Sequence, residues 1–232
     1  GLRSGEVVVV EAKEVEAKFE LRLRCRVSHV RKREISEIKY SKDGCWLAVG
    51  SKENLVDIYQ VGEAHEYAHA AVCKGHSGAV AHIDWDESGQ FLQSVDTSYE
   101  PLFWKLSALP EYSGGKATEL KPHTLAADLQ NVKWHTNTCP VTWASIGVMG
   151  ASGTEVKAVD RDQERTFLLA ANDKHEVCMF AYPAVEGAKC KSSGTAHCSK
   201  VTNVRVLCGG RKAVSVGGRD LSCVVWDIAD VS

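Results

Sequence analysis

The sequence predicts an all-β fold made of repeated antiparallel sheets. One pattern of alternating and apolar runs occurs four times, at residues 38–61, 83–106, 156–183 and 204–228. Each copy contains three candidate strands separated by two polar turns, and an aromatic residue lies in the third strand. These aromatic residues are Tyr59, Trp104, Phe180 and Trp226. Two of their separations, 45 and 46 residues, match the period of about 40–45 residues that is typical of a β-propeller blade.

The last copy ends in Trp226-Asp227, the dipeptide that names the WD40 repeat. A small antiparallel sheet cannot bury its apolar faces alone, so propellers pack such sheets radially and bury a core between neighbouring blades. The predicted fold is therefore a WD40-type β-propeller with four-stranded antiparallel blades.

The first complete copy predicts its strands in order. Alternation at residues 38–40 predicts the first strand, and Asp43-Gly44 then supplies a tight-turn pair. The apolar run 46–51 predicts a buried second strand, and 55–61 predicts the third. Residues 67–74 predict a fourth, outer strand.

A histidine precedes the second copy and the last copy. His76 follows Gly75, and His197 occupies the matching place later in the chain. In WD40 proteins such a histidine bonds an aspartate in a neighbouring turn. Asp220 suits that role for His197, whereas Ser98 occupies the corresponding position for His76. We therefore expect the bond between the histidine and an aspartate to be complete for His197 and incomplete for His76.

The two ends of the sequence predict an incomplete ring. Strands are expected at residues 5–10 and 18–27, and the last copy lacks an outer strand. We expect roughly five blade-equivalents. The expected division is a partial blade at 1–34, a blade at 35–75, a blade with an extended outer segment at 76–135, an irregular segment plus a blade at 136–195, and a blade without its outer strand at 196–232.

Composition predicts an ordinary globular protein inside the cell. The net charge is −2, 44% of residues are apolar and 25% are charged, which disfavours general nucleic-acid binding. No apolar stretch is long enough to cross a bilayer, and no secretory signal opens the sequence. We expect the nine cysteines to be mostly reduced thiols. Cys190, His197 and Cys198 lack the paired spacing of a zinc site, so we expect neither a metal nor a cofactor.

The sequence contains no recognisable catalytic motif, and we expect no catalytic residues. The spacing Gly147-x-x-Gly150-x-x-Gly153 differs from that of a nucleotide-binding loop and predicts a flexible loop. Two carboxylate pairs recur at the same position of the repeat, which favours a structural role. They are Asp84 with Asp86 and Asp160 with Asp162.

A basic segment is the main candidate for binding a partner. Arg22, Arg24 and Arg26 alternate with apolar residues, so a strand would place them on one face. Three further cations, Arg31, Lys32 and Arg33, extend the segment. One hypothesis is attraction to an acidic partner. The other is a solvated outer strand whose charges protect its edge.

Motifs in both regular and irregular segments go beyond a general WD40 pattern. They lie at residues 38–44, 47–51, 56–59, 75–77, 134–139, 153–159, 180–183, 197–204 and 217–220. In these motifs the chain resembles the echinoderm microtubule-associated protein-like family, in the second of its two tandem propellers. The resemblance implies a non-enzymatic scaffold that contributes to tubulin or microtubule binding in the cytoplasm, on the spindle or in the axoneme. The alternative is a WD40 scaffold that binds other proteins without contacting tubulin; neither alternative includes nucleic acid or a membrane.

Overall fold

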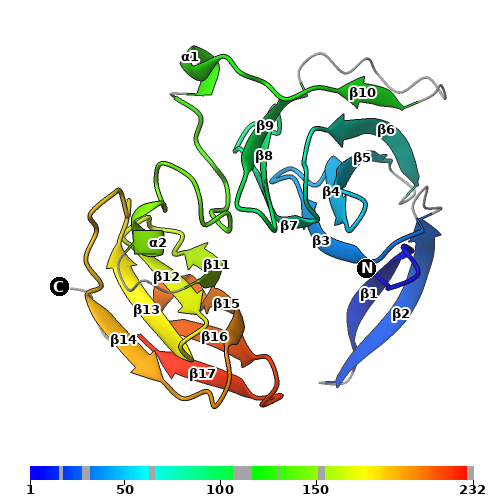
Figure 1. The fold of residues 1–232 in the computed structure, drawn as a ribbon. Coiled ribbons are helices and arrows are strands. Elements are labelled where there is room, and N and C mark those ends of the chain that lie inside the picture. The colour runs from blue at the N-terminus through cyan, green and yellow to red at the C-terminus, as the bar shows by residue number, and fades with distance from the viewer. Residues whose placement is uncertain are drawn as a thin grey trace. The chain divides into compact units, whose positions relative to one another are not determined.

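The structure is a computed structural model that describes residues 1–15, 18–27, 32–62, 66–106, 117–129, 131–150 and 155–228. Over these ranges the chain forms seventeen strands, two short α-helices and one 3₁₀ turn (Figure 1). None of the described helices has the length and apolar character needed to cross a bilayer. The chain divides into two compact units, Gly1–His135 and Thr136–Ser232.

The first unit contains a sheet whose first four strands are antiparallel and follow chain order. They are β3 (Ile35–Tyr40), β4 (Trp46–Ser51), β5 (Leu55–Val61) and β6 (Tyr67–Lys74). The turn after β3 is fixed by Asp43, whose carboxylate accepts hydrogen bonds from the Ser41 hydroxyl at 2.6 Å and the Cys45 N–H at 3.0 Å. Gly44 follows with a φ of 74°, a conformation that glycine adopts without steric cost.

The next sheet is three-stranded over the described residues. It consists of β7 (Val80–Trp85), β8 (Phe91–Asp96) and β9 (Pro101–Lys105). Asp86 closes the turn between β7 and β8 by accepting the N–H groups of Ser88 and Phe91. After β9 the chain returns, and β10 (Thr118–Leu120) pairs in parallel with β6 of the preceding sheet. The sequence pattern does not predict this parallel pair.

The core of the first unit lies between neighbouring sheets. Ala48 and Ile58 of the first sheet pack with Ile83, Trp85 and Trp104 of the next, and all five are buried. Polar ties reinforce the apolar contact. The Trp85 indole donates to the Lys39 carbonyl at 3.0 Å, and the Lys39 ammonium lies 3.4 Å from the buried Asp84 carboxylate. Burial between sheets is the arrangement expected of a propeller.

A hairpin opens the chain and packs by its base. It is formed by β1 (Val7–Val15) and β2 (Lys18–Val27), which pair antiparallel with a bulge between Val9 and Val10 (Figure 1). Val7 and Val27 are buried against β4 and β5. Leu21 and Leu23 are exposed, so these apolar side chains, farther from the base, are not buried in a core.

The second unit repeats the plan with two sheets. The first holds β11 (Val156–Arg161), β12 (Phe167–Asn172), β13 (Glu176–Ala181) and β14 (Ser192–Thr195); the second holds β15 (Val201–Leu207), β16 (Lys212–Gly217) and β17 (Cys223–Asp227). Their core includes Phe167, Leu169 and Val204, with Trp226 packed against it. A Cβ at Gly194 would lie 2.5 Å from the Trp226 ring, so only glycine permits this contact.

The prediction of a flexible loop at residues 147–153 is wrong for residues 147–150. Residues Gly147–Gly150 form the short helix α2, and Gly147 is buried. Its N–H donates to the Ala184 carbonyl at 2.8 Å. Gly153 lies outside the described residues. Gly147 therefore lies in close contact with another backbone segment. The spacing of the glycines does not show whether such a glycine is packed or lies in a flexible loop. The other short helix, α1 (Ala126–Leu129), lies in the first unit.

Candidate functional sites: two histidine networks and a charged hairpin

The first candidate site is a polar network in the last sheet. His197 Nδ1 lies 2.7 Å from Ser222 Oγ and 3.3 Å from Asp220 Oδ2, and its Nε2 lies 2.7 Å from Ser215 Oγ. The Trp226 indole N–H donates to the same Ser215 hydroxyl at 2.8 Å. Two residues singled out from the sequence, His197 and Trp226, thus meet through Ser215, and the third, Asp220, contacts His197 on its other side. Sequence reasoning missed this serine; the signal was a hydroxyl on the strand that precedes the aromatic strand.

Asp220 is held as a carboxylate by this network. Its oxygens accept the N–H of Cys198 at 2.9 Å and that of Ser222 at 3.4 Å. Burial raises the pKa of Asp220, but hydrogen bonds from Ser222, Cys198 and Ser199 outweigh burial and hold the pKa well below its ordinary value. The ionised side chain therefore stabilises the folded sheet.

Replacing Asp220 with asparagine is expected to flatten the acid side of the stability profile. A carboxyl with a lowered pKa in the fold contributes stability above its unfolded pKa of about 3.9, and that contribution is lost as the pH falls further. Urea midpoints measured from about pH 6 down to about pH 2 check this. The wild-type midpoint should drop more steeply below about pH 4 than that of Asp220→Asn. Parallel profiles would contradict the proposed contribution of Asp220.

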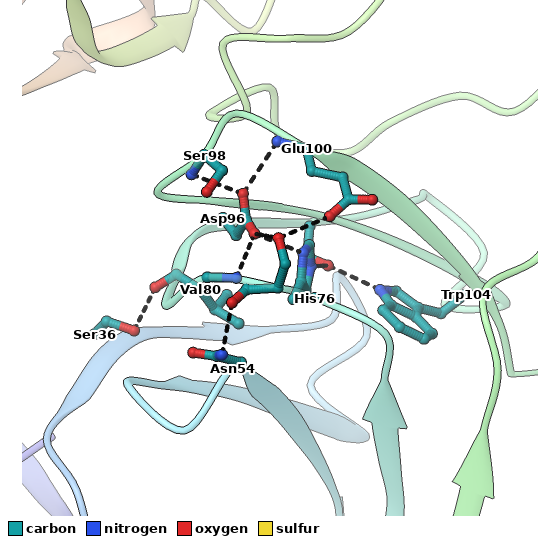
Figure 2. A network of polar contacts seen from close by, with 11 residues as sticks. Ser36, Asn54, His76, Val80, Asp96, Ser98, Glu100 and Trp104 are labelled. Atoms are coloured by element: carbon teal, nitrogen blue, oxygen red, sulfur yellow. Dashed lines mark hydrogen bonds and ion pairs between the residues drawn. The ribbon is translucent and has the colours of Figure 1, made fainter.

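The second network surrounds His76 in the first unit (Figure 2). His76 Nε2 lies 2.6 Å from Ser94 Oγ, and the Trp104 indole donates to that hydroxyl at 2.8 Å. Nδ1 of His76 is buried and has no hydrogen-bond partner. Ser98 occupies the position where the sequence comparison with His197 places an aspartate, but a different acid, Asp96, approaches the histidine, with its Oδ2 3.8 Å from Nδ1. The tie is still open, since this separation is too long for a hydrogen bond.

Asp96 faces the neighbouring loop. Its carboxylate accepts the N–H of Gly78 at 2.8 Å, of Ser98 at 2.8 Å and of Glu100 at 3.1 Å (Figure 2). Burial raises the pKa of Asp96, but these backbone bonds and His76 lower it below its ordinary value. Burial lowers the pKa of His76, and Asp96 and Glu100 only partly oppose that effect. The imidazole is therefore neutral near neutral pH.

The remaining repeat residues have packing roles. Asp43 and Gly44 form the turn before β4. Tyr59 is fully buried in β5 and its ring lies 5.0 Å from that of His69, whose Nε2 contacts the buried Asp57 carboxylate at 2.8 Å. Phe180 is buried in β13.

The structure pairs the basic hairpin internally. Each arginine of β2 has a glutamate partner: Arg22 with Glu20 at 2.9 Å, Arg24 with Glu11 at 2.6 Å, and Arg26 with Glu6 at 3.5 Å. All three arginines are exposed, as are Lys32 and Arg33, while Arg31 lies outside the described residues. The glutamates offset much of the positive field that the sequence alone predicts.

A polar groove of about 590 Å³ lies among loops of the second unit. Its lining includes Asp173, His175, Lys200, Arg219 and Asp220. Within the described part of the chain, neither Lys200 nor Arg219 forms an ion pair with a carboxylate. Both side chains are exposed.

Comparison with solved structures defines the class. The C-terminal WD40 domain of Sif2 matches 97% of this chain and 64% of its own, with a TM-score of 0.59 and 12% identity. The β-propeller domain of Cps50 (Swd1) from Myceliophteria thermophila matches 81% of this chain and 63% of its own, with a TM-score of 0.53 and 16% identity. At these identities the likeness shows the fold alone. Together with the stacked antiparallel sheets, it identifies the chain as a WD40-type β-propeller, as the sequence predicts.

The family follows from sequence comparison. The model of the echinoderm microtubule-associated protein second beta-propeller matches residues 1–228, and the chain belongs to this family. Echinoderm microtubule-associated protein-like 1 of Mus musculus is 33% identical over 198 residues, which cover 84% of this chain and 23% of that protein. Echinoderm microtubule-associated protein-like 2 of Rattus norvegicus is 32% identical over 199 residues, which cover 84% of this chain and 29% of that protein. The chain thus spans less than a third of the length of these relatives.

Proposed function

We propose that this chain is a non-enzymatic scaffold whose propeller contributes to binding tubulin or microtubules in the cytoplasmic cytoskeleton. The observation that carries the proposal is the match of the family model along residues 1–228. The relatives that match the chain are named as microtubule-associated proteins. We also propose that the blades have the limits that the sequence predicts.

The chemistry of the two histidine networks supports a scaffold. In each network the imidazole contacts a serine that also accepts an indole N–H, and both serines are buried within a sheet. Such groups stabilise the sheets and are not directed at a substrate. Function then depends on the outer surface, as is usual for repeat folds.

Two surfaces carry cations suited to an acidic partner such as a tubulin surface. On the hairpin, Arg22, Arg24 and Arg26 are exposed but paired with glutamates. Exposed ion pairs contribute little free energy, about 0–1 kcal/mol each, so an acidic partner can compete for these arginines. In the groove of the second unit, Lys200 and Arg219 have no such competition from described carboxylates.

Charge reversal at the hairpin is expected to weaken microtubule binding. The chain and its Arg22→Glu/Arg24→Glu/Arg26→Glu variant would be sedimented with stabilised microtubules over a range of salt concentrations. Because the variant leaves the neighbouring glutamates unpaired, the hairpin becomes strongly acidic and should be repelled by an acidic surface. We expect the apparent affinity to fall at least about fivefold at low salt.

A matched control reverses three exposed lysines that are also paired with carboxylates. Lys74 pairs with Glu119, Lys105 with Asp128 and Lys212 with Asp227. Equal loss in both triple variants would assign the effect to net charge and exclude the hairpin as a specific contact. If the unmodified chain does not sediment with microtubules, direct tubulin binding by this chain is wrong and the alternative scaffold function is favoured.

A further inference from the structure

The two histidine networks differ at one corner. In the last sheet, Nδ1 of His197 contacts Ser222 and Asp220. In the first unit, the equivalent Nδ1 of His76 has no hydrogen-bond partner although the side chain is fully buried. A buried nitrogen without a hydrogen-bond partner destabilises the fold, and such groups are rare in native proteins.

The position of the acid explains why the corner stays open. Asp220 lies in the loop beyond β16, five residues after Ser215, whereas Asp96 lies at the end of β8, only two residues after Ser94. Backbone N–H groups of Gly78, Ser98 and Glu100 hold the Asp96 carboxylate beside the loop. Asp96 therefore faces Nδ1 without reaching it.

A second carboxylate faces the same corner. Ligand atoms of His76, Asp96 and Glu100 all lie within 4.8 Å of one another. The Ser77 hydroxyl lies between the two carboxylates, 3.4 Å from Asp96 Oδ2 and 3.3 Å from Glu100 Oε2. An imidazole nitrogen and two carboxylates thus lie close together, with a hydroxyl as a further oxygen donor. No such second carboxylate is described beside His197.

The donor set indicates the class of ion. One imidazole nitrogen with carboxylate oxygens is a combination that Zn²⁺ and similar divalent transition metals accept, whereas Ca²⁺ and Mg²⁺ prefer oxygen ligands throughout. Zinc ligands lie about 2.0–2.2 Å from the ion, so neighbouring donors are about 3.4 Å apart. The observed spacing is wider. Glu100 is exposed, so rotation of its side chain can bring its carboxylate closer. The 3.8 Å between His76 Nδ1 and Asp96 Oδ2 must also shorten by about 0.4 Å when the ion binds.

The surroundings of His76 are compatible with metal binding. Histidine ligands usually donate their second ring N–H to a fixed acceptor, which sets the tautomer and the ring orientation. Ser94 Oγ, 2.6 Å from Nε2, can accept that proton, because a hydroxyl has two lone pairs and the Trp104 indole uses one of them. This tautomer leaves the Nδ1 lone pair directed at Asp96 and Glu100.

We propose that His76 Nδ1, Asp96 and Glu100 form a binding site for a divalent transition-metal ion such as Zn²⁺. This site is independent of microtubule binding and revises the sequence-based expectation that the chain binds no metal. The ion would neutralise two adjacent carboxylates and give the buried nitrogen its partner. It would connect the loop before β7 to the turn after β8 and so stiffen that edge of the sheet.

Titration with Co²⁺ tests the proposal. Thiolates are good ligands for such ions, and Cys45 and Cys190 are free and exposed. Co²⁺ bound to thiolate is therefore recognised by its ultraviolet charge-transfer absorption and counted separately. We expect one further equivalent bound without thiolate absorption. In a parallel titration, diamagnetic Zn²⁺ should shift the His76 Nδ1 resonance in nitrogen NMR spectra.

Glu100→Gln removes one ligand from an exposed position and should not disturb folding. We expect it to weaken binding at this site about tenfold or more. Glu66→Gln, an equal change at another exposed glutamate of the same unit, should leave binding unchanged. Unaltered affinity in Glu100→Gln, or a His76 resonance that does not respond to the ion, would overturn the proposal.

Discussion

Replacing Trp104 with alanine is expected to destabilise the first unit by about 3–5 kcal/mol, the range for removing a large aromatic side chain from a core. Trp104 is fully buried and packs with Ile58, Ile83 and Trp85 between two sheets. Its indole N–H also bonds Ser94, which in turn contacts His76. The substitution therefore creates a cavity and removes one donor from a buried network at the same time. Urea denaturation followed by circular dichroism measures the loss.

Trp143→Ala is the matched control for this experiment. It removes the same side chain from a position where 64% of the residue is exposed to solvent. Surface substitutions of this kind usually change stability by no more than about 0.5 kcal/mol. If both variants lose the same stability, the loss at Trp104 does not come from its burial between the sheets. A large effect confined to Trp104→Ala would show that the contact between these two sheets stabilises the unit.

The strands were predictable because local pattern determines them. The predicted strands at residues 18–27, 46–51, 55–61 and 67–74 match β2, β4, β5 and β6 in the structure. Alternation, apolar runs and turn pairs such as Asp43-Gly44 act within a few residues, so one sequence suffices to find them. The parallel pair of β6 with β10 was missed because it joins segments 47 residues apart, Ala71 and Thr118, through contacts that no local pattern records.

The networks were predictable only in part. His197, Asp220 and Trp226 carry a recognisable spacing, and the structure brings them together. Ser94 and Ser215 were missed because a single serine on a strand is chemically unremarkable until a histidine and a tryptophan reach it from other segments. Likewise, the alternation of Arg22, Arg24 and Arg26 predicts exposure but not their pairing with glutamates, two of which lie on β1 or just before it.

Gly147 is the residue whose sequence-based interpretation was furthest from its structural role, and Gly147→Ala is the second substitution with a large expected effect. A Cβ at this position would lie 1.9 Å from the Val185 carbonyl oxygen and 2.8 Å from that of Ala184. Both atoms belong to the backbone, so relief requires a shift of the chain. Overpacking typically costs about 1–3 kcal/mol, and we expect about 3 kcal/mol here because the Gly147 bond to Ala184 is disturbed as well.

Gly62→Ala separates this steric effect from the general consequence of replacing glycine. At Gly62 the nearest atoms to an added Cβ are 3.6 Å away, an ordinary contact, and the residue is exposed. Restricting the unfolded chain should make that variant neutral or slightly more stable. Comparable thermal midpoints for the two variants would contradict the steric argument and favour the prediction that Gly147 lies in a flexible loop. A selective loss in Gly147→Ala would instead show that helix α2 is fixed against residues 184–185 by the absence of a side chain.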